Sequence, residues 1–125
     1  MDFVTAIAAC FGQYATFDGR ASRAEFWYFT VFVAIGGAVF HLLDFVLFPA
    51  MDEPPLGSIF KVLVLLPLLA VAARRLHDID KSGWWQFINF VPLVGSIIFL
   101  IWTTSLGTRG PNRFGDPVVK VAAMV

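Results

Sequence analysis

Charge is scarce in this chain of 125 residues. Charged residues make up 14% of it, against about 25% in an average soluble domain, and hydrophobic residues make up 58%. Nine basic and nine acidic residues balance, which argues against a basic nucleic-acid-binding protein. The single cysteine, Cys10, excludes a disulfide framework. Because only two histidines accompany it, we expect neither a metal site nor a cofactor.

Long apolar runs take the place of the missing charge. Residues 26–48, 56–73 and 84–106 contain only two charged side chains, Asp44 and Lys61. At about 1.5 Å per helical residue, the first and third runs can cross a hydrocarbon core of about 30 Å. Fourteen Phe and four Trp also exceed what one small soluble core could bury. The sequence therefore predicts an all-α integral membrane protein with about three transmembrane helices.

Capping and breaking residues set the expected boundaries. Ser22 and Glu25 have the spacing of a capping box, and Ser82 can cap a later helix. Apolar residues recur at helical spacing in the N-terminal stretch, which indicates a short helix in the membrane interface or packed on the other helices. We expect a single membrane domain with an interfacial segment (1–22), two spanning helices (23–48 and 56–75), a third membrane segment (84–106) and a polar tail (107–125).

The third segment leaves two topologies open. Its uncharged length favours a full span, which would put the basic residues of the tail outside the cell. The stretch Pro92–Gly95 near its middle can instead kink the helix or fold it back as a re-entrant hairpin. A hairpin keeps the tail on the same side as the N-terminal segment and the loop at 74–83. The positive-inside rule favours this second arrangement, because only Lys61 then lies toward the outer face.

Two charged residues lie within the first two helices. Asp44 lies shortly before the loop that joins the first two apolar runs, and Lys61 lies shortly after it, at a similar depth in the membrane. Because a short loop makes these helices antiparallel neighbours, we expect Asp44 and Lys61 to form an intramembrane pair. The alternative is that each side chain snorkels separately to the interface.

Three polar segments carry a resemblance to a known family. They cover residues 17–27, 74–85 and 107–117, and the second reads Arg-Arg-Leu-His-Asp followed by Ser-Gly-Trp-Trp. Together they resemble domain-of-unknown-function family 805, the YhaH-like small bacterial inner-membrane proteins. The resemblance implies a multi-pass protein of the bacterial cytoplasmic membrane and no settled activity. Asp80 and the ending Gly115-Asp116-Pro117 depart from the family's usual pattern.

The polar segments support three functional hypotheses. The first is a non-enzymatic packing module in which ion pairs tie the loops together: Arg74 with Asp78 along one helix, and Arg20 or Arg23 with Asp78 or Asp80 between segments. The second is an anionic-lipid or phosphate site made by the surplus arginines. The third is a membrane enzyme that uses His77 with Asp78, without a recognised nucleophile motif. Expected partners are membrane lipids, which the second hypothesis makes anionic, and a membrane protein or second copy, but no nucleic acid. The candidate residues are Asp18, Arg20, Arg23, Glu25, Arg74, Arg75, His77, Asp78, Ser82, Arg109, Asn112 and Arg113.

Overall fold

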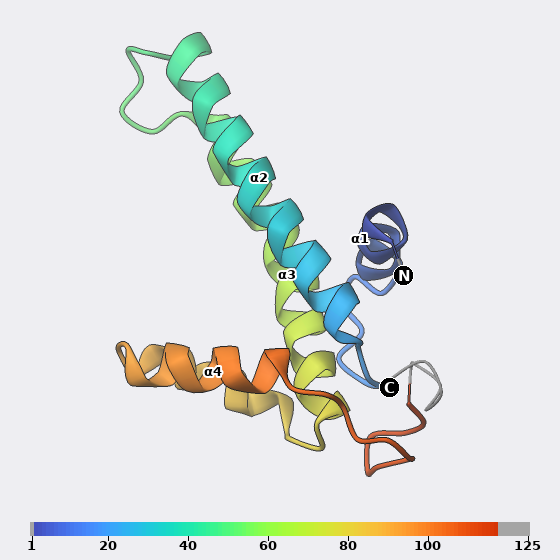
Figure 1. Ribbon diagram of the computed structural model, residues 1–125. Helices are drawn as coiled ribbons and strands as arrows, with labels where there is room; N and C mark the ends of the chain where they lie inside the picture. The colour runs from blue at the N-terminus through green and yellow to red at the C-terminus, as the bar shows by residue number, and fades with distance from the viewer. Residues whose placement is uncertain (1, 118–125) are drawn as a thin grey trace.

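The computed structural model describes residues 2–117, so the sequence-predicted end of the tail, with Lys120, lies outside the described residues. Within this range the chain is helical and has no strand, which confirms the predicted all-α class. The helices are α1 (Phe3–Gly12), α2 (Arg23–Leu47), α3 (Pro55–Asp78), the 3-10 helix η1 (Gly83–Phe90) and α4 (Val94–Thr104). Figure 1 shows α2 and α3 as a long antiparallel hairpin, with the other helices gathered at one end.

The α2–α3 hairpin contains the two described helices that are long and apolar enough to cross a membrane. α2 begins where the capping box predicts, since the Ser22 hydroxyl accepts a hydrogen bond from the Glu25 backbone N–H at 3.2 Å. Gly36 lets the Phe60 ring of α3 approach closely, because a Cβ at this position would overlap the ring. Many large apolar side chains of the hairpin away from its foot are exposed, as expected of helices that face lipid.

The N-terminal helix α1 lies against the base of the hairpin. The Asp2 carboxylate caps it by accepting a hydrogen bond from the Thr5 backbone N–H at 2.7 Å. Ala6 and Cys10 are buried on its inner face, and the Phe11 ring meets Phe29 of α2 edge-to-face. The helix therefore packs on the hairpin, as one of the two sequence-based alternatives expects.

The third apolar segment is not one straight helix. It divides into η1 and α4, which are separated by a bend at residues 91–93. Leu93 takes a positive φ of 61° at this bend, and a Cβ at Gly95 would overlap the Ile88 carbonyl. α4 has 11 residues and is therefore about 16 Å long, which is too short to cross the hydrocarbon core. The bend lies at the predicted break, whereas a continuous helix over 84–106 is not formed.

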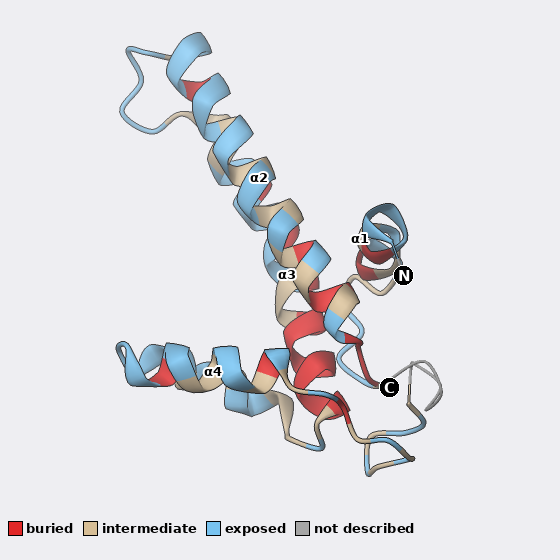
Figure 2. Cartoon of the chain, in the orientation of Figure 1, coloured by how far each residue is buried: buried red, intermediate tan, exposed pale blue. Residues whose placement is uncertain are grey.

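The bend and the tail build a second structural layer at one end of the hairpin. Figure 1 shows α4 lying sideways at the foot of α3 with its C-terminal end next to that foot, and the tail continuing past it. We call residues 83–117 the platform. Figure 2 shows that burial is concentrated where the platform, the last turns of α3 and the start of α2 meet. Large buried side chains at this junction include Arg74 and Arg75, neither of which is exposed at all.

Candidate functional site

A buried ionic network occupies the junction between the hairpin and the platform. It consists of three arginines and two carboxylates: Arg20, Glu25, Arg74, Arg75 and Asp78. Each of these residues is no more than 5% exposed. Charges removed this far from water are stable only when they are paired and hydrogen-bonded. The sequence predicts these residue types, but the pairing is decided by the fold.

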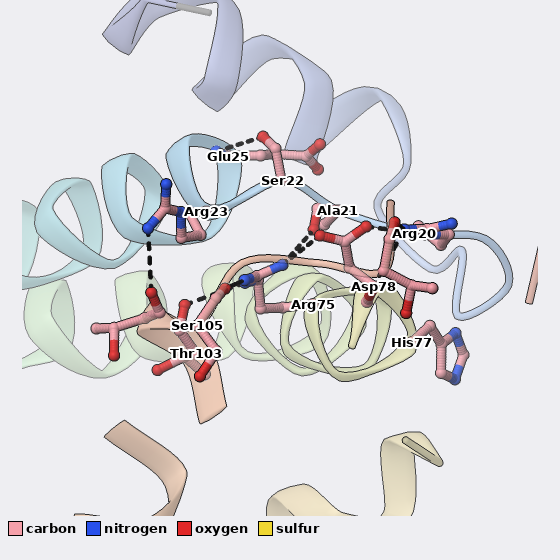
Figure 3. A network of polar contacts seen from close by, with 12 residues as sticks. Arg20, Ala21, Ser22, Arg23, Glu25, Arg75, His77, Asp78, Thr103 and Ser105 are labelled. Carbon is pink, nitrogen blue, oxygen red and sulfur yellow. Dashed lines mark hydrogen bonds and ion pairs between the residues drawn. The ribbon is translucent and has the colours of Figure 1, made fainter. Parts of the chain in front are cut away.

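Asp78, the last residue of α3, binds two arginines at once. Its Oδ1 accepts from Arg20 Nε at 2.8 Å, and its Oδ2 accepts from Arg75 Nη1 at 2.5 Å (Figure 3). Arg20 comes from the loop before α2, so this carboxylate joins that loop to the end of α3. The predicted contact between Arg74 and Asp78 is wrong, because the carboxylate is occupied by Arg75 and Arg20.

Arg74 points to a different side of α3 from Arg75 and pairs with Glu25 of α2. The Arg74 Nη1 to Glu25 Oε2 distance is 2.5 Å, and Arg74 Nε donates to the Thr16 carbonyl at 3.1 Å. Cys10 lies beside this pair, with its Sγ 3.6 Å from the same Glu25 oxygen. Burial, and then the charge of Glu25, raises the pKa of the Cys10 thiol to about 12. This thiol is therefore held in its protonated, unreactive form.

The C-terminus of α4 is held by donors from the hairpin. Arg75 Nε donates to the Thr103 carbonyl at 3.0 Å, and its Nη2 donates to the Ser105 carbonyl. Arg23 Nη1 donates to the Thr104 carbonyl at 3.2 Å, and Trp27 Nε1 also reaches Thr103 at 3.2 Å. The last carbonyls of a helix have no partner within it and carry partial negative charge. Cationic side chains of α2 and α3 therefore fix the position of α4.

The tail is bound to the end of α3 by the same chemistry. Arg20 donates to the carbonyls of Thr108 at 2.5 Å and Gly110 at 2.9 Å. The Thr108 backbone N–H donates to the Asp78 carbonyl at 2.7 Å, and Asn112 Nδ2 donates to the His77 carbonyl at 2.9 Å. Gly107 passes against the Asp78 carboxylate, where a Cβ would overlap it. These contacts bring all three sequence-predicted polar segments together.

His77 lies outside the ionic network, as Figure 3 shows. Its Nδ1 is 2.9 Å from the Gly19 carbonyl oxygen, and the Phe114 ring stacks on the imidazole at 3.9 Å between centroids. Within residues 2–117 no carboxylate hydrogen-bonds to this imidazole. Asp78, the other candidate catalytic residue, is engaged by arginines. The two residues therefore lack the contact that a histidine–carboxylate pair requires.

The predicted pair between Asp44 and Lys61 is not formed. Asp44 is buried, and its two oxygens accept from the backbone N–H groups of Leu56 at 2.9 Å and Gly57 at 2.8 Å. The carboxylate thus caps the first turn of α3, where orphan N–H groups and the helix dipole favour a negative charge. Pro54 precedes this turn and supplies no side-chain cap. Lys61 lies one turn further along and is exposed.

The remaining predicted residues lie at the rim of the site. Arg113 forms an exposed ion pair with Asp80, with its Nε 3.3 Å from Oδ1. Arg109 and Asp18 are exposed, and Ser82 caps η1 through the Trp84 backbone N–H at 3.4 Å. In the part of the chain that the structure describes, no three metal-ligating side chains come together.

Sequence reasoning missed the acceptors that complete the network. Thr103, Ser105 and Thr108 contribute mainly through backbone carbonyls, which every residue carries. Only Gly107 offers a sequence signal, as a small residue where the tail must approach a side chain closely.

The amino-acid sequence matches one family model and several inner membrane proteins. The family model described as "Protein of unknown function (DUF805)" matches residues 14–116. The chain is 43% identical to the inner membrane protein YhaH of Escherichia coli K12 over 108 residues, covering 84% of the chain and 89% of the relative. It is 41% identical to the inner membrane protein YhaI of the same strain over 104 residues, covering 83% and 86%. No solved structure matches the chain.

Proposed function

The chain belongs to the DUF805 family of proteins of unknown function, and we propose that it acts as a non-enzymatic packing and interaction module. Its relatives are inner membrane proteins and it has helices able to span a membrane, so it is an inner-membrane protein. In this proposal the hairpin anchors the chain, and the ionic network fixes the platform as a rigid surface for other membrane components.

The proposal rests on what the buried guanidinium groups bind: they bind groups of the protein itself. Arg20 and Arg75 each bind Asp78 and several backbone carbonyls, and Arg74 binds Glu25 and a carbonyl. An anion site would present several unoccupied donors to a ligand, whereas here the one nitrogen of these three guanidinium groups without a partner among the described residues is the buried Arg74 Nη2. An enzyme would need a base and its orienting partner in contact. The network instead directs its charge at the protein's own chain, which supports a structural role.

We propose with it a topology in which the platform stays on the cytoplasmic side. The contacts of Arg20 hold the N-terminal loop, the end of α3 and the tail together. Most of the basic residues among 2–117 then lie on that face, and of these residues only Lys61 lies toward the other end of the hairpin, as the positive-inside rule favours. η1 and α4 would lie in the cytoplasmic leaflet, with exposed apolar side chains toward its lipid.

Thermal unfolding tests the structural role. The purified full chain in detergent is heated with inorganic phosphate or with phosphatidylglycerol, against sodium chloride of equal ionic strength. If the network binds phosphate, a phosphate concentration about 100 times the Kd should raise the free energy of unfolding by about 2.7 kcal/mol. If its arginines bind only the protein itself, that free energy should not change measurably. Arg109→Gln, which removes an exposed cation, controls for surface attraction. A phosphate-specific rise in Tm that persists in Arg109→Gln would overturn the proposal.

Cysteine labelling in intact cells tests the topology. Cys10→Ala removes the native thiol, and single cysteines are then placed at exposed positions as Asp52→Cys in the hairpin loop and Arg109→Cys in the tail. A membrane-impermeant maleimide added outside should label Asp52→Cys alone, and both should react after the cells are lysed. Equal labelling of the two variants in intact cells would show a translocated tail and contradict the proposed topology.

A further inference from the structure

A cavity opens beside His77, on the side of α3 away from the ionic network. It has a volume of about 520 Å³ and lies between the loop before α2, the end of α3, η1 and the tail. Aromatic side chains from all but α3 line it: Phe17, Trp84, Phe87 and Phe114. Its size and mainly apolar lining are those of a small-molecule or lipid site. The proposed packing role makes no use of this cavity.

A second cavity of about 340 Å³ adjoins the first. The two share Leu69, Gln86 and Phe87 in their linings. The second cavity is further lined by side chains of α2, α3 and α4, most of them apolar, including Phe26, Leu68 and Phe99. The two cavities together therefore run from a polar end near the loops to an apolar end between the hairpin and the platform. This gradient matches a molecule with a polar head and a hydrocarbon chain.

The polar end presents acceptors for hydrogen bonds. Asp18 lines it, and within residues 2–117 its carboxylate has no ion-pair or hydrogen-bond partner. His77 Nδ1 faces the Gly19 carbonyl, which can only accept, so this nitrogen carries a proton, and in the neutral ring Nε2 is then an acceptor. Nε2 lies on the side of Gly83, another residue of the cavity lining.

The cations near this end are turned to other partners. Lys81 Nζ lies 4.8 Å over the Trp102 ring, and Arg113 pairs with Asp80. Arg20, like the other arginines of the ionic network, is bound by the protein itself. Among the residues that line the cavity, Asp18 is the only Asp, Glu, Lys or Arg. This favours a ligand with a cationic head over one that carries only an anionic head.

We propose that the two cavities form a binding site for a phospholipid with a primary ammonium headgroup. The ammonium group donates to the Asp18 carboxylate and to His77 Nε2, and the Ser82 hydroxyl, which also lines the cavity, can donate to the phosphate. An acyl chain passes Leu69 and Phe87 into the apolar cavity. The site binds lipid without chemical change, and it is separate from the arginines that the sequence suggested for an anionic lipid.

Native mass spectrometry of the full chain tests this site. The purified protein is mixed with equal amounts of phosphatidylethanolamine and phosphatidylglycerol that carry the same acyl chains. We expect the wild type to retain phosphatidylethanolamine about threefold or more over phosphatidylglycerol, as an exposed charge pair allows. Equal retention of the two lipids, or retention of neither, would overturn the proposal.

Two matched pairs of variants locate the bound lipid. Leu69→Trp adds bulk at a residue that lines both cavities, and Leu65→Trp places the same bulk one turn away, outside both linings. Asp18→Asn removes the free carboxylate, and Asp52→Asn removes one in the hairpin loop. Leu69→Trp should lose the bound lipid, and Asp18→Asn should bring the lipid preference close to parity. Both controls should behave as the wild type does.

The variants also guard against misfolding as the cause of lost lipid. Each must keep the wild-type helical content and elution volume in size-exclusion chromatography. Asp18 lies on an exposed loop, so Asp18→Asn decides the headgroup claim even if Leu69→Trp does not fold. Unchanged lipid preference in Asp18→Asn, or unchanged retention in a folded Leu69→Trp, would exclude this site. A failure here leaves the proposed packing role standing, because that role rests on the ionic network.

Discussion

The two ends of the α2–α3 hairpin bury charge in different ways. At the loop end, Asp44 binds two backbone N–H groups that lie only 12 and 13 residues away. At the platform end, Asp78 and Glu25 bind arginines that lie 58 and 49 residues away in the sequence. The first arrangement caps the start of one helix, whereas the second joins the end of α3 to α2 and to the loop before it. The same residue type therefore acts as a local cap at one end and as a tertiary lock at the other.

The largest effect should come from Asp78→Asn. The substitution leaves Arg20 and Arg75 buried without their shared counter-charge, and breaking a buried pair in this way costs about 3–5 kcal/mol. We expect that loss in the free energy of unfolding in detergent, together with faster proteolysis of the tail. Asp116→Asn, at an exposed position of the same tail, should change stability by less than about 0.5 kcal/mol. Equal behaviour of the two variants would refute the role of Asp78.

A double-mutant cycle tests the other buried ion pair at the platform end, between Glu25 and Arg74. Glu25→Met and Arg74→Met should each cost about 3 kcal/mol, because each leaves one buried charge unpaired. The double variant should be more stable than either single variant, since an apolar pair needs no counter-charge. Arg74 Nη2 finds no partner among the described residues, which adds to the gain on its removal. Additive losses in the unfolding free energy would show that the two side chains act independently.

At the loop end the effects should be smaller. Asp44→Ala removes the cap of α3 and should cost about 1–2 kcal/mol. Asp44→Asn keeps an oxygen acceptor and should cost less than about 1 kcal/mol. Lys61→Met should be close to neutral in the same unfolding measurement, because Lys61 forms no ion pair with Asp44. If Lys61→Met lowers the free energy of unfolding as much as Asp44→Ala does, the result would support the ion pair between Asp44 and Lys61 that the sequence predicts.

The smallest effect concerns pH and Cys10. The raised pKa of about 12 means that the folded state stabilises the protonated thiol, a contribution that is present below about pH 9 and is lost as the pH rises toward 12. Cys10 should therefore add no pH dependence to stability between about pH 6 and 8. At pH 8 its thiolate fraction is about a thousandfold below that of an ordinary thiol.

Maleimide labelling measures this difference at the platform end. Native Cys10 should react far more slowly than the exposed cysteine of Arg109→Cys in the Cys10→Ala background, and at the same rate once both are denatured. Equal rates in the folded proteins would show that the junction around Glu25 and Arg74 opens readily.

Local signals in the sequence predict the helices well. Ser22 marks the start of α2 within one residue, and the apolar runs identify α2 and α3. The end of α3 is predicted less well, since the helix continues past Arg75 to Asp78. The break near Pro92 is visible in the sequence, but its outcome is not. A proline and a glycine permit a bend, and only contacts with neighbouring segments determine how far the chain turns.

Sequence alone determined that this is a helical membrane protein with its polar chemistry in three short segments, because hydrophobic length and capping are local properties of the chain. Only the tertiary structure decided the partners. Asp78 pairs with Arg75 rather than Arg74, and Asp44 caps a helix rather than pairing with Lys61. Which donor reaches a carboxylate depends on how helices rotate and where distant backbone carbonyls lie. Residue types do not encode that geometry until the helices pack.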